Sequence, residues 1–251
     1  GIYRICIPFE RVYTTSFLLK NNGKLMIADT GSSKSDVEQY ILPVLRKMNE
    51  EPDYIVCSHF HGDHSGGLQT LMETFPEVVV GCFSKERQGE RYHHFTEGEL
   101  FFDRFQMLNL PGHTDDSLGI YDLQTKALLT FDSLQKFGLD RFGTGVCDYR
   151  IYRKTIQKVR ELAPNEIIAA HEYVPDGFRA VGGDEVAKFL INCEMSINNI
   201  SNFGRAHRDL NWDEISKLYM EENPQLPHIG SIGFVEASKE WEDYENIVFR
   251  Q

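Results

Sequence analysis

The sequence predicts a mixed α/β fold followed by a mainly helical C-terminal segment. Short apolar runs of strand type alternate with helical apolar patterns as far as about residue 180. Several of the runs end at a His or Asp, and beyond residue 180 only helical spacing remains. The 251 residues suffice for one large domain or two small ones. We expect one domain over residues 1–180 and a helical extension over residues 181–251 that packs on it.

The first half is predicted to open with strands. Residues 13–19 and 24–28 are rich in strand formers, and Asn21-Asn22-Gly23 between them is a turn signal. Ser35, three residues before Glu38, predicts the N-cap of a helix that Pro43 should kink. Further apolar runs predict strands at 54–57, 78–80, 105–110, 118–121 and 127–131, with a helix at 68–75.

The second half is predicted to be largely helical. Apolar residues over 151–162 share one helical face, and that helix should stop before Pro164. A strand at 167–170 runs into His171. A long helix follows over 186–200, and Asn211 with Glu214 three residues later predicts the start of another.

Composition excludes several classes of protein. The net charge of −12 disfavours nucleic-acid binding, which needs a basic face. No apolar run approaches the roughly 20 residues of a membrane span. The five scattered cysteines, with no Cys-x-x-Cys pair, are typical of reduced thiols. We therefore expect a cytoplasmic protein that binds a small-molecule substrate, without nucleic acid or membrane; a homodimer stays open.

Histidines and an aspartate cluster after one predicted strand, in the hexapeptide His59-Phe60-His61-Gly62-Asp63-His64. Imidazole and carboxylate ligands together suit zinc, with iron or manganese as alternatives. At the end of a strand, His59 and His61 can project toward one metal, and Asp63 and His64 can turn toward a second. The hexapeptide therefore predicts a metal site.

Further motifs follow in order along the chain: Asp29-Thr30-Gly31, Gly112-His113-Thr114, Asp132 after a strand, and His171 after another. With the hexapeptide, they make residues 3–180 resemble the metallo-β-lactamase-fold hydrolase superfamily, in its glyoxalase II-like and lactonase-like branch. The resemblance implies a catalytic domain built as a four-layer αββα sandwich. Asp115-Asp116-Ser117 departs from the pattern that many members carry after their Gly-His-Thr, so no subfamily is identified.

The resemblance also implies two divalent metal ions. The first would be bound by three histidines and the second by a mixed set, with one aspartate bridging them: His59, His61 and His113; Asp63, His64 and His171; and Asp132. Asp29 would orient a ligand histidine or its loop. Asp63 would also orient the nucleophile. Tyr173 either contacts the substrate or packs as a half-buried tyrosine.

The implied reaction is attack by a metal-bridging hydroxide on a small ester, thioester or lactone. Hydrolysis of a small phosphodiester, iron-dependent redox chemistry and a binding module without turnover are the alternatives. His93 and His94, in a stretch expected to form a loop, and Asp115 and Asp116 receive no defined role. The substrate, the native metal and the purpose of the C-terminal extension are left open.

Overall fold

The structure is a computed structural model that describes residues 1–10, 12–136, 146, 148–173, 177–224 and 230–241. The chain divides into two compact units. The first contains residues 1–110, 116–131 and 168–178, and the second contains residues 111–115, 132–167 and 179–251. The domain boundary expected at residue 180 stays a prediction.

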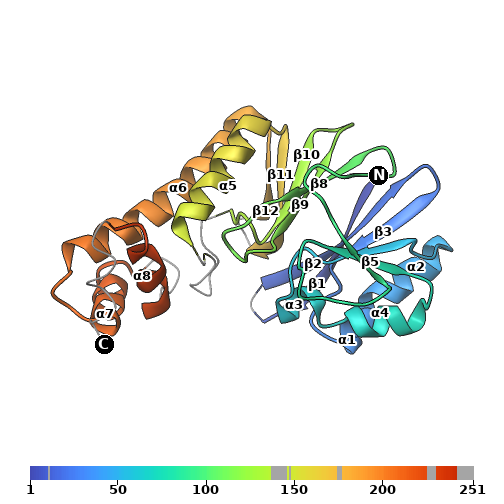
Figure 1. Cartoon of the computed structure of the whole chain (residues 1–251), viewed down its shortest axis with the longest axis horizontal. Helices are drawn as coiled ribbons and strands as arrows, with labels where there is room; N and C mark the ends of the chain where they lie inside the picture. Colours follow the sequence, from blue (N-terminus) through green and yellow to red (C-terminus); the bar gives the residue numbers. More distant parts are fainter. Residues whose placement is uncertain (11, 137–145, 147, 174–176, 225–229, 242–251) are drawn as a thin grey trace. The chain divides into compact units, whose positions relative to one another are not determined.

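Two sheets form most of the first unit (Figure 1). In one, antiparallel strands at the N-terminus lead into parallel ones: β1 (Ile2–Phe9), β2 (Val12–Asn21), β3 (Lys24–Ala28), β4 (Tyr54–Val56), β5 (Val79–Cys82) and β6 (Tyr92–His94). The other has β7 (Leu100–Phe101), β8 (Phe105–Asn109), β9 (Leu118–Asp122), β10 (Ala127–Phe131) and β11 (Glu166–Tyr173). The pair Glu172 and Tyr13 joins β11 to β2, so the strand order runs β6-β5-β4-β3-β2-β11-β10-β9-β8-β7.

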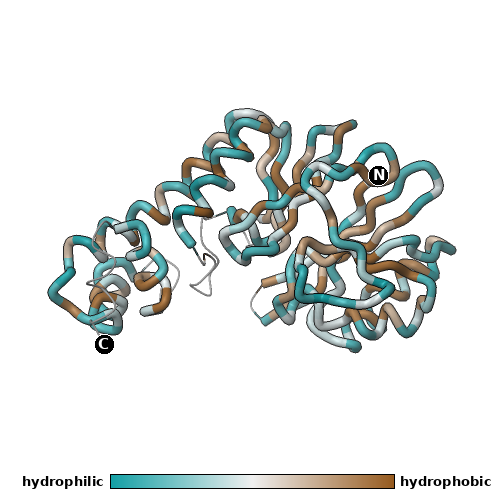
Figure 2. Tube along the Cα trace, viewed as in Figure 1, coloured by the Kyte–Doolittle hydropathy of each residue, from teal (hydrophilic) through white to brown (hydrophobic). Residues whose placement is uncertain are grey.

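Alternating side chains of these strands feed two apolar cores. Phe17 of β2 packs with Met26, Phe105 and Leu129 in a core to which both sheets contribute. Its neighbour Leu18 belongs to the second core, because successive strand residues point to opposite faces. The second core also takes side chains from the helices that cover the first sheet. The strands accordingly carry most of the brown, hydrophobic trace of this unit (Figure 2). The first unit thus has a helical layer and two sheet layers.

The covering helices are α1 (Lys34–Asp36), the π-helical turn η1 (Val37–Ile41), α2 (Leu42–Met48), α3 (Gly62–Ser65) and α4 (Leu68–Thr74). The predicted N-cap at Ser35 was wrong, because the Ser33 hydroxyl accepts the hydrogen bond from Asp36 N at 3.2 Å. Pro43 is accommodated by η1, in which Leu42 N–H donates to Val37 O. A wider turn suits a residue that lacks an N–H and whose ring crowds the carbonyl four residues back.

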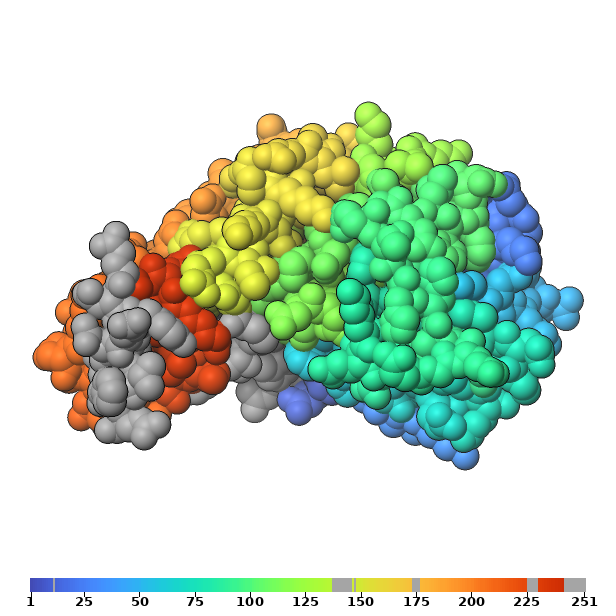
Figure 3. Space-filling model, in the orientation of Figure 1, coloured from blue at the N-terminus to red at the C-terminus, as the bar shows by residue number. Residues whose placement is uncertain are grey.

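The second unit is helical, apart from the ends of β11 and β12 (Gly177–Val181). Its helices are α5 (Tyr149–Leu162), α6 (Gly183–Ala206), α7 (Trp212–Glu222) and α8 (Ser231–Ser238). Asn211 and Glu214 form the capping box that the sequence predicts. Helices α5 and α6 pack together, in yellow and orange in Figure 3. No helix among the described residues has the length and apolarity to cross a bilayer.

Candidate metal centre

The histidine segment leaves the carboxyl end of β4, which pairs in parallel with β3 on one side and β5 on the other. Cys57 N donates to Gly81 O at 3.0 Å and continues the strand pairing up to the segment. His59 and His64 are buried, Asp63 is half-buried and His61 is exposed. The edge of a parallel sheet where strands end is a common place for a site. Here it presents imidazoles and a carboxylate together.

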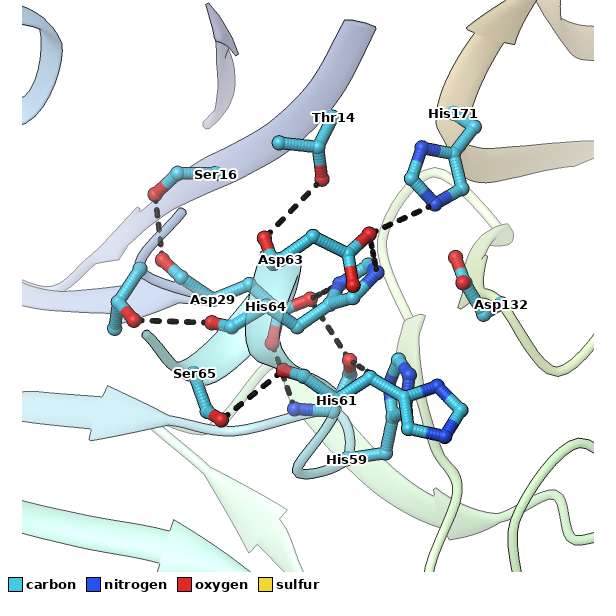
Figure 4. A network of polar contacts seen from close by, with 12 residues as sticks. Thr14, Ser16, Asp29, His59, His61, Asp63, His64, Ser65, Asp132 and His171 are labelled. Carbon is cyan, nitrogen blue, oxygen red and sulfur yellow. Dashed lines mark hydrogen bonds and ion pairs between the residues drawn. The ribbon is translucent and has the colours of Figure 1, made fainter. Parts of the chain in front are cut away.

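Asp29 follows β3 and lies under this segment, fully buried. Its carboxylate accepts three hydrogen bonds: from Ser58 N at 2.8 Å, from Ser58 Oγ at 2.7 Å and from His64 Nδ1 at 2.8 Å (Figure 4). Burial raises the pKa of Asp29, while the charge of His64 and the hydrogen bonds from His64 and Ser58 act in the opposite direction. One carboxylate therefore fixes both ends of the histidine segment.

Three of the imidazoles have their Nδ1 committed to the protein. Ser58 Oγ donates to Asp29, so it accepts from His59 Nδ1 at 3.0 Å. His64 Nδ1 donates to Asp29, and His171 Nδ1 donates to the Tyr13 carbonyl at 3.2 Å. This pattern sets the tautomer and leaves each Nε2 as an electron-pair donor. The residues present therefore fit a bound metal.

The donor atoms also converge. Asp63 Oδ2 lies 3.2 Å from His64 Nε2 and 3.3 Å from His171 Nε2 (Figure 4). The ligand atoms of His59 and His61 lie within 4.8 Å of each other. The separations of 3.2 and 3.3 Å are those of ligands that share one ion, given metal–ligand bonds of roughly 2.0–2.2 Å. The first unit thus gathers five of the seven predicted ligands.

The remaining two ligands belong to the second unit. His113 lies in the loop 111–115, and Asp132 is the residue after β10. His113 Nε2 is 3.6 Å from Asp132 Oδ2, and both side chains are buried. This unit therefore pairs an imidazole with a carboxylate.

The two adjacent histidines to which the sequence assigns no role lie in a strand. His93 and His94 form strand β6 rather than the expected loop. His93 Nε2 contacts Glu99 Oε1 at 2.6 Å, and its ring packs edge-on against Phe101. The pairing of β6 with β5 explains this strand, and a single sequence gives no signal for such a long-range partner. His93 thus contacts a carboxylate and aromatic rings.

Asp115, Asp116 and Tyr173 are the other residues that the sequence singles out. Asp115 is exposed and Asp116 is half-buried. Tyr173 ends β11, and its side chain lies outside the described residues. Sequence reasoning missed Ser58, whose only signal is a hydroxyl directly before the first ligand histidine. It also missed the Tyr13 carbonyl, a backbone group with no signal in sequence.

Comparisons with known proteins show which family the chain is similar to. The family model described as the metallo-beta-lactamase superfamily matches residues 10–171. A beta-lactamase-like protein 2 homolog of Caenorhabditis elegans is 29% identical over 180 residues, covering 67% of this chain and 59% of that protein. A hydroxyacylglutathione hydrolase of Blochmanniella pennsylvanica is 26% identical over 191 residues, covering 74% and 68%. An atrochrysone carboxyl ACP thioesterase of Claviceps purpurea is 22% identical over 128 residues, covering 50% and 41%. The chain thus spans only about 59% of the C. elegans relative.

Solved structures share the fold. The structure of TMB-1 superposes with a TM-score of 0.61 at 17% identity, covering 78% of this chain and 93% of that one. Rubredoxin oxygen:oxidoreductase from Desulfovibrio gigas gives 0.58 at 17% identity, covering 83% and 68%. These matches confirm the predicted α/β fold of the αββα type with a helical C-terminal portion. Two of the relatives are named as a hydrolase and a thioesterase, as expected for a hydrolase family. With the family model matching well over half of its length, the chain belongs to the metallo-β-lactamase superfamily.

Proposed function

We propose that the chain is a metal-dependent hydrolase of a small ester, thioester or lactone, with a dinuclear centre made of all seven ligands. His59, His61 and His113 would hold one metal; Asp63, His64 and His171 would hold the other; Asp132 would bridge them. The observation that carries the proposal is the commitment of Nδ1 in His59, His64 and His171, which leaves their Nε2 atoms for metal.

The chain path supports the inclusion of His113 and Asp132. Leu110 N donates to Ser117 O at 2.8 Å, so the two ends of the His113 loop are held together. Leu118 N donates to Ser58 O at 2.8 Å, and Ser58 immediately precedes His59. Asp132 directly follows β10, a strand of the first unit. Both residues are therefore tethered by short connections to the unit that carries the other ligands.

Bound divalent metals, zinc first and iron or manganese as alternatives, would supply Lewis-acid chemistry and lower the pKa of water toward roughly 7. Asp63 is half-buried, so its carboxylate can accept a hydrogen bond from the attacking water and orient it. The buried histidines keep their orientation through Asp29, Ser58 and the Tyr13 carbonyl. No side-chain nucleophile is required.

The names of the relatives favour a thioester. One is called a hydroxyacylglutathione hydrolase and another an ACP thioesterase, so both are named for acyl-thiol substrates. The net charge of −12 disfavours a polynucleotide as the substrate. Within the proposal, an acyl thioester ranks before esters and lactones.

Replacement of Asp63 by Asn tests the proposal. The amide keeps the size of the side chain but removes the negative charge of the proposed ligand and replaces one of its two acceptor oxygens by an NH2 donor. We expect turnover of the best substrate in a thioester, ester and lactone panel to fall at least ~100-fold. Elemental mass spectrometry of the wild type, purified without added metal, should give about two metals per chain.

The exposed Asp103, replaced by Asn, is the control and should retain full turnover. Unchanged turnover in Asp63→Asn would overturn the proposal. So would one iron per chain with oxygen uptake, or hydrolysis of bis-p-nitrophenyl phosphate alone.

A further inference from the structure

We propose that Tyr152 and Thr155 of α5 and Cys193 of α6 are positioning residues for the metal ligands His113 and Asp132. Helices α5 and α6 of the second unit would then fix the positions of the two backbone segments that carry His113 and Asp132. This inference rests on the proposed function, since it concerns two ligands of the same centre.

The His113 loop lies directly on α5. Thr155 Oγ1 donates to the Pro111 carbonyl at 2.5 Å, and Thr155 is 2% exposed. Gly112 has φ +131°, and a Cβ at this position would lie 2.8 Å from the Tyr152 Cα. Gly112 N donates to Thr114 O at 3.1 Å, which closes a tight turn around His113. Backbone contact on this scale leaves the loop no room to shift toward the helix.

The segment after Asp132 is held by α6. Cys193 is fully buried, and its Sγ donates to the Gln135 carbonyl at 3.4 Å. Burial raises the pKa of Cys193 to about 12, so the thiol keeps its proton and remains a donor. Gln135 is three residues beyond Asp132. The thiol therefore fixes the backbone that follows the proposed bridging ligand.

Tyr152 links the two contacts. Its backbone adjoins Gly112, and its side chain hydrogen-bonds to Cys193. Tyr152 is 1% exposed, so neighbouring groups hold it on all sides. The path from Gly112 through Tyr152 and Cys193 to Gln135 spans the two segments whose ligands lie 3.6 Å apart. Because metal sites tolerate displacements of only about 0.5 Å, this path should tune metal affinity.

Conservative variants separate positioning from plain packing. Thr155→Val and Tyr152→Phe each remove one hydroxyl and keep nearly the same volume. We expect each to weaken metal binding about 10-fold, as loss of a partner that orients a ligand does. Competition with a chelator measures this affinity. The visible spectrum of the Co²⁺-substituted protein should shift, and Thr155→Ser should restore both readouts.

The matched control is Tyr219→Phe, which removes the hydroxyl of a buried tyrosine from α7 of the same unit. It should leave metal affinity and the Co²⁺ spectrum unchanged. The positioning role is overturned if Thr155→Val and Tyr152→Phe behave like Tyr219→Phe, or if Thr155→Ser fails to restore affinity.

Hydrogen exchange of the metal-free protein keeps this test separate from the proposed function. In Thr155→Val the Gly112 amide should exchange at least about 5-fold faster, because its loop loses an anchor. A wild type that binds no metal defeats the proposed function, whereas an unchanged Gly112 exchange rate defeats the positioning role alone.

Discussion

Two of the segments that carry candidate ligands, residues 59–64 and the His113 loop, are held by different means. Residues 59–64 are fixed by polar contacts of the first unit, with Asp29 taking hydrogen bonds from Ser58 and His64. The His113 loop is fixed by helix packing in the second unit, where Gly112 lies against Tyr152. A polar anchor sets the tautomer of an imidazole, whereas a packed backbone sets only its position. Loss of a hydrogen bond in the first segment should therefore disturb the orientation of an imidazole, whereas loss of a contact in the second should disturb only the position of the loop.

Replacement of Asp29 by Ala should have the largest effect. The change leaves Ser58 N, Ser58 Oγ and His64 Nδ1 without an acceptor in a buried place. Each unsatisfied buried group costs about 1–3 kcal/mol, so we expect the free energy of unfolding to fall by about 3–5 kcal/mol. Metal content should fall with it. Urea unfolding and elemental analysis of the same samples measure both.

Asp53→Ala is the control for Asp29→Ala. Asp53 also accepts from a backbone amide, Leu25 N at 2.9 Å, and pairs with Lys24, but it is half-buried and away from the ligands. Asp53→Ala should lower the free energy of unfolding by about 1 kcal/mol and leave the metal content unchanged. Equal metal content in the two variants would contradict the role of Asp29.

Gly66 and Gly62 give an intermediate contrast. A Cβ at residue 66 would lie 2.0 Å from the Ser32 carbonyl oxygen, whereas a Cβ at residue 62 meets nothing within 4 Å. Gly66→Ala must displace the backbone beside the ligand segment, so we expect a loss of about 2–3 kcal/mol. Gly62→Ala should change stability by less than about 1 kcal/mol, because alanine favours the helix α3. Thermal melts of both variants measure this difference in stability. Similar melting temperatures would show that the close approach to Ser32 is not essential.

Ser58→Ala should have the smallest effect. His59 Nδ1 loses its acceptor and Asp29 loses one of its donors, while the backbone bond from Ser58 N remains. We expect the free energy of unfolding to fall by about 1 kcal/mol and the metal affinity to fall about 10-fold. In the Asp29→Ala background the same change should cost much less, because the hydroxyl no longer has its carboxylate partner. Chelator competition measures the metal affinity of the two single variants and of the double variant. If the two losses of affinity add fully in the double variant, Ser58 does not act together with Asp29.

Much of the fold was predictable from local patterns. The runs at 105–110, 118–121 and 127–131 fall on β8, β9 and β10, and the capping box at Asn211 and Glu214 is present. These features depend on side-chain alternation or on contacts between residues three apart. The N-cap at Ser33, the π turn before Pro43 and the strand at His93 escaped prediction. The strand depends on a partner distant in sequence, and the N-cap depends on which of several serines the chain path favours.

The sequence by itself determined which atoms are available for a metal, because His59, His61, Asp63 and His64 fall within six residues and must emerge from one turn. Only the tertiary structure decided which nitrogen each imidazole presents. That choice depends on Asp29 and the Tyr13 carbonyl, which come from the end of β3 and from β2, and on Ser58, which is itself bonded to Asp29. The contact of Tyr152 with Gly112 was likewise invisible in sequence, since packing joins residues that no local period relates. Residue chemistry is local, whereas ligand orientation is set by long-range contacts.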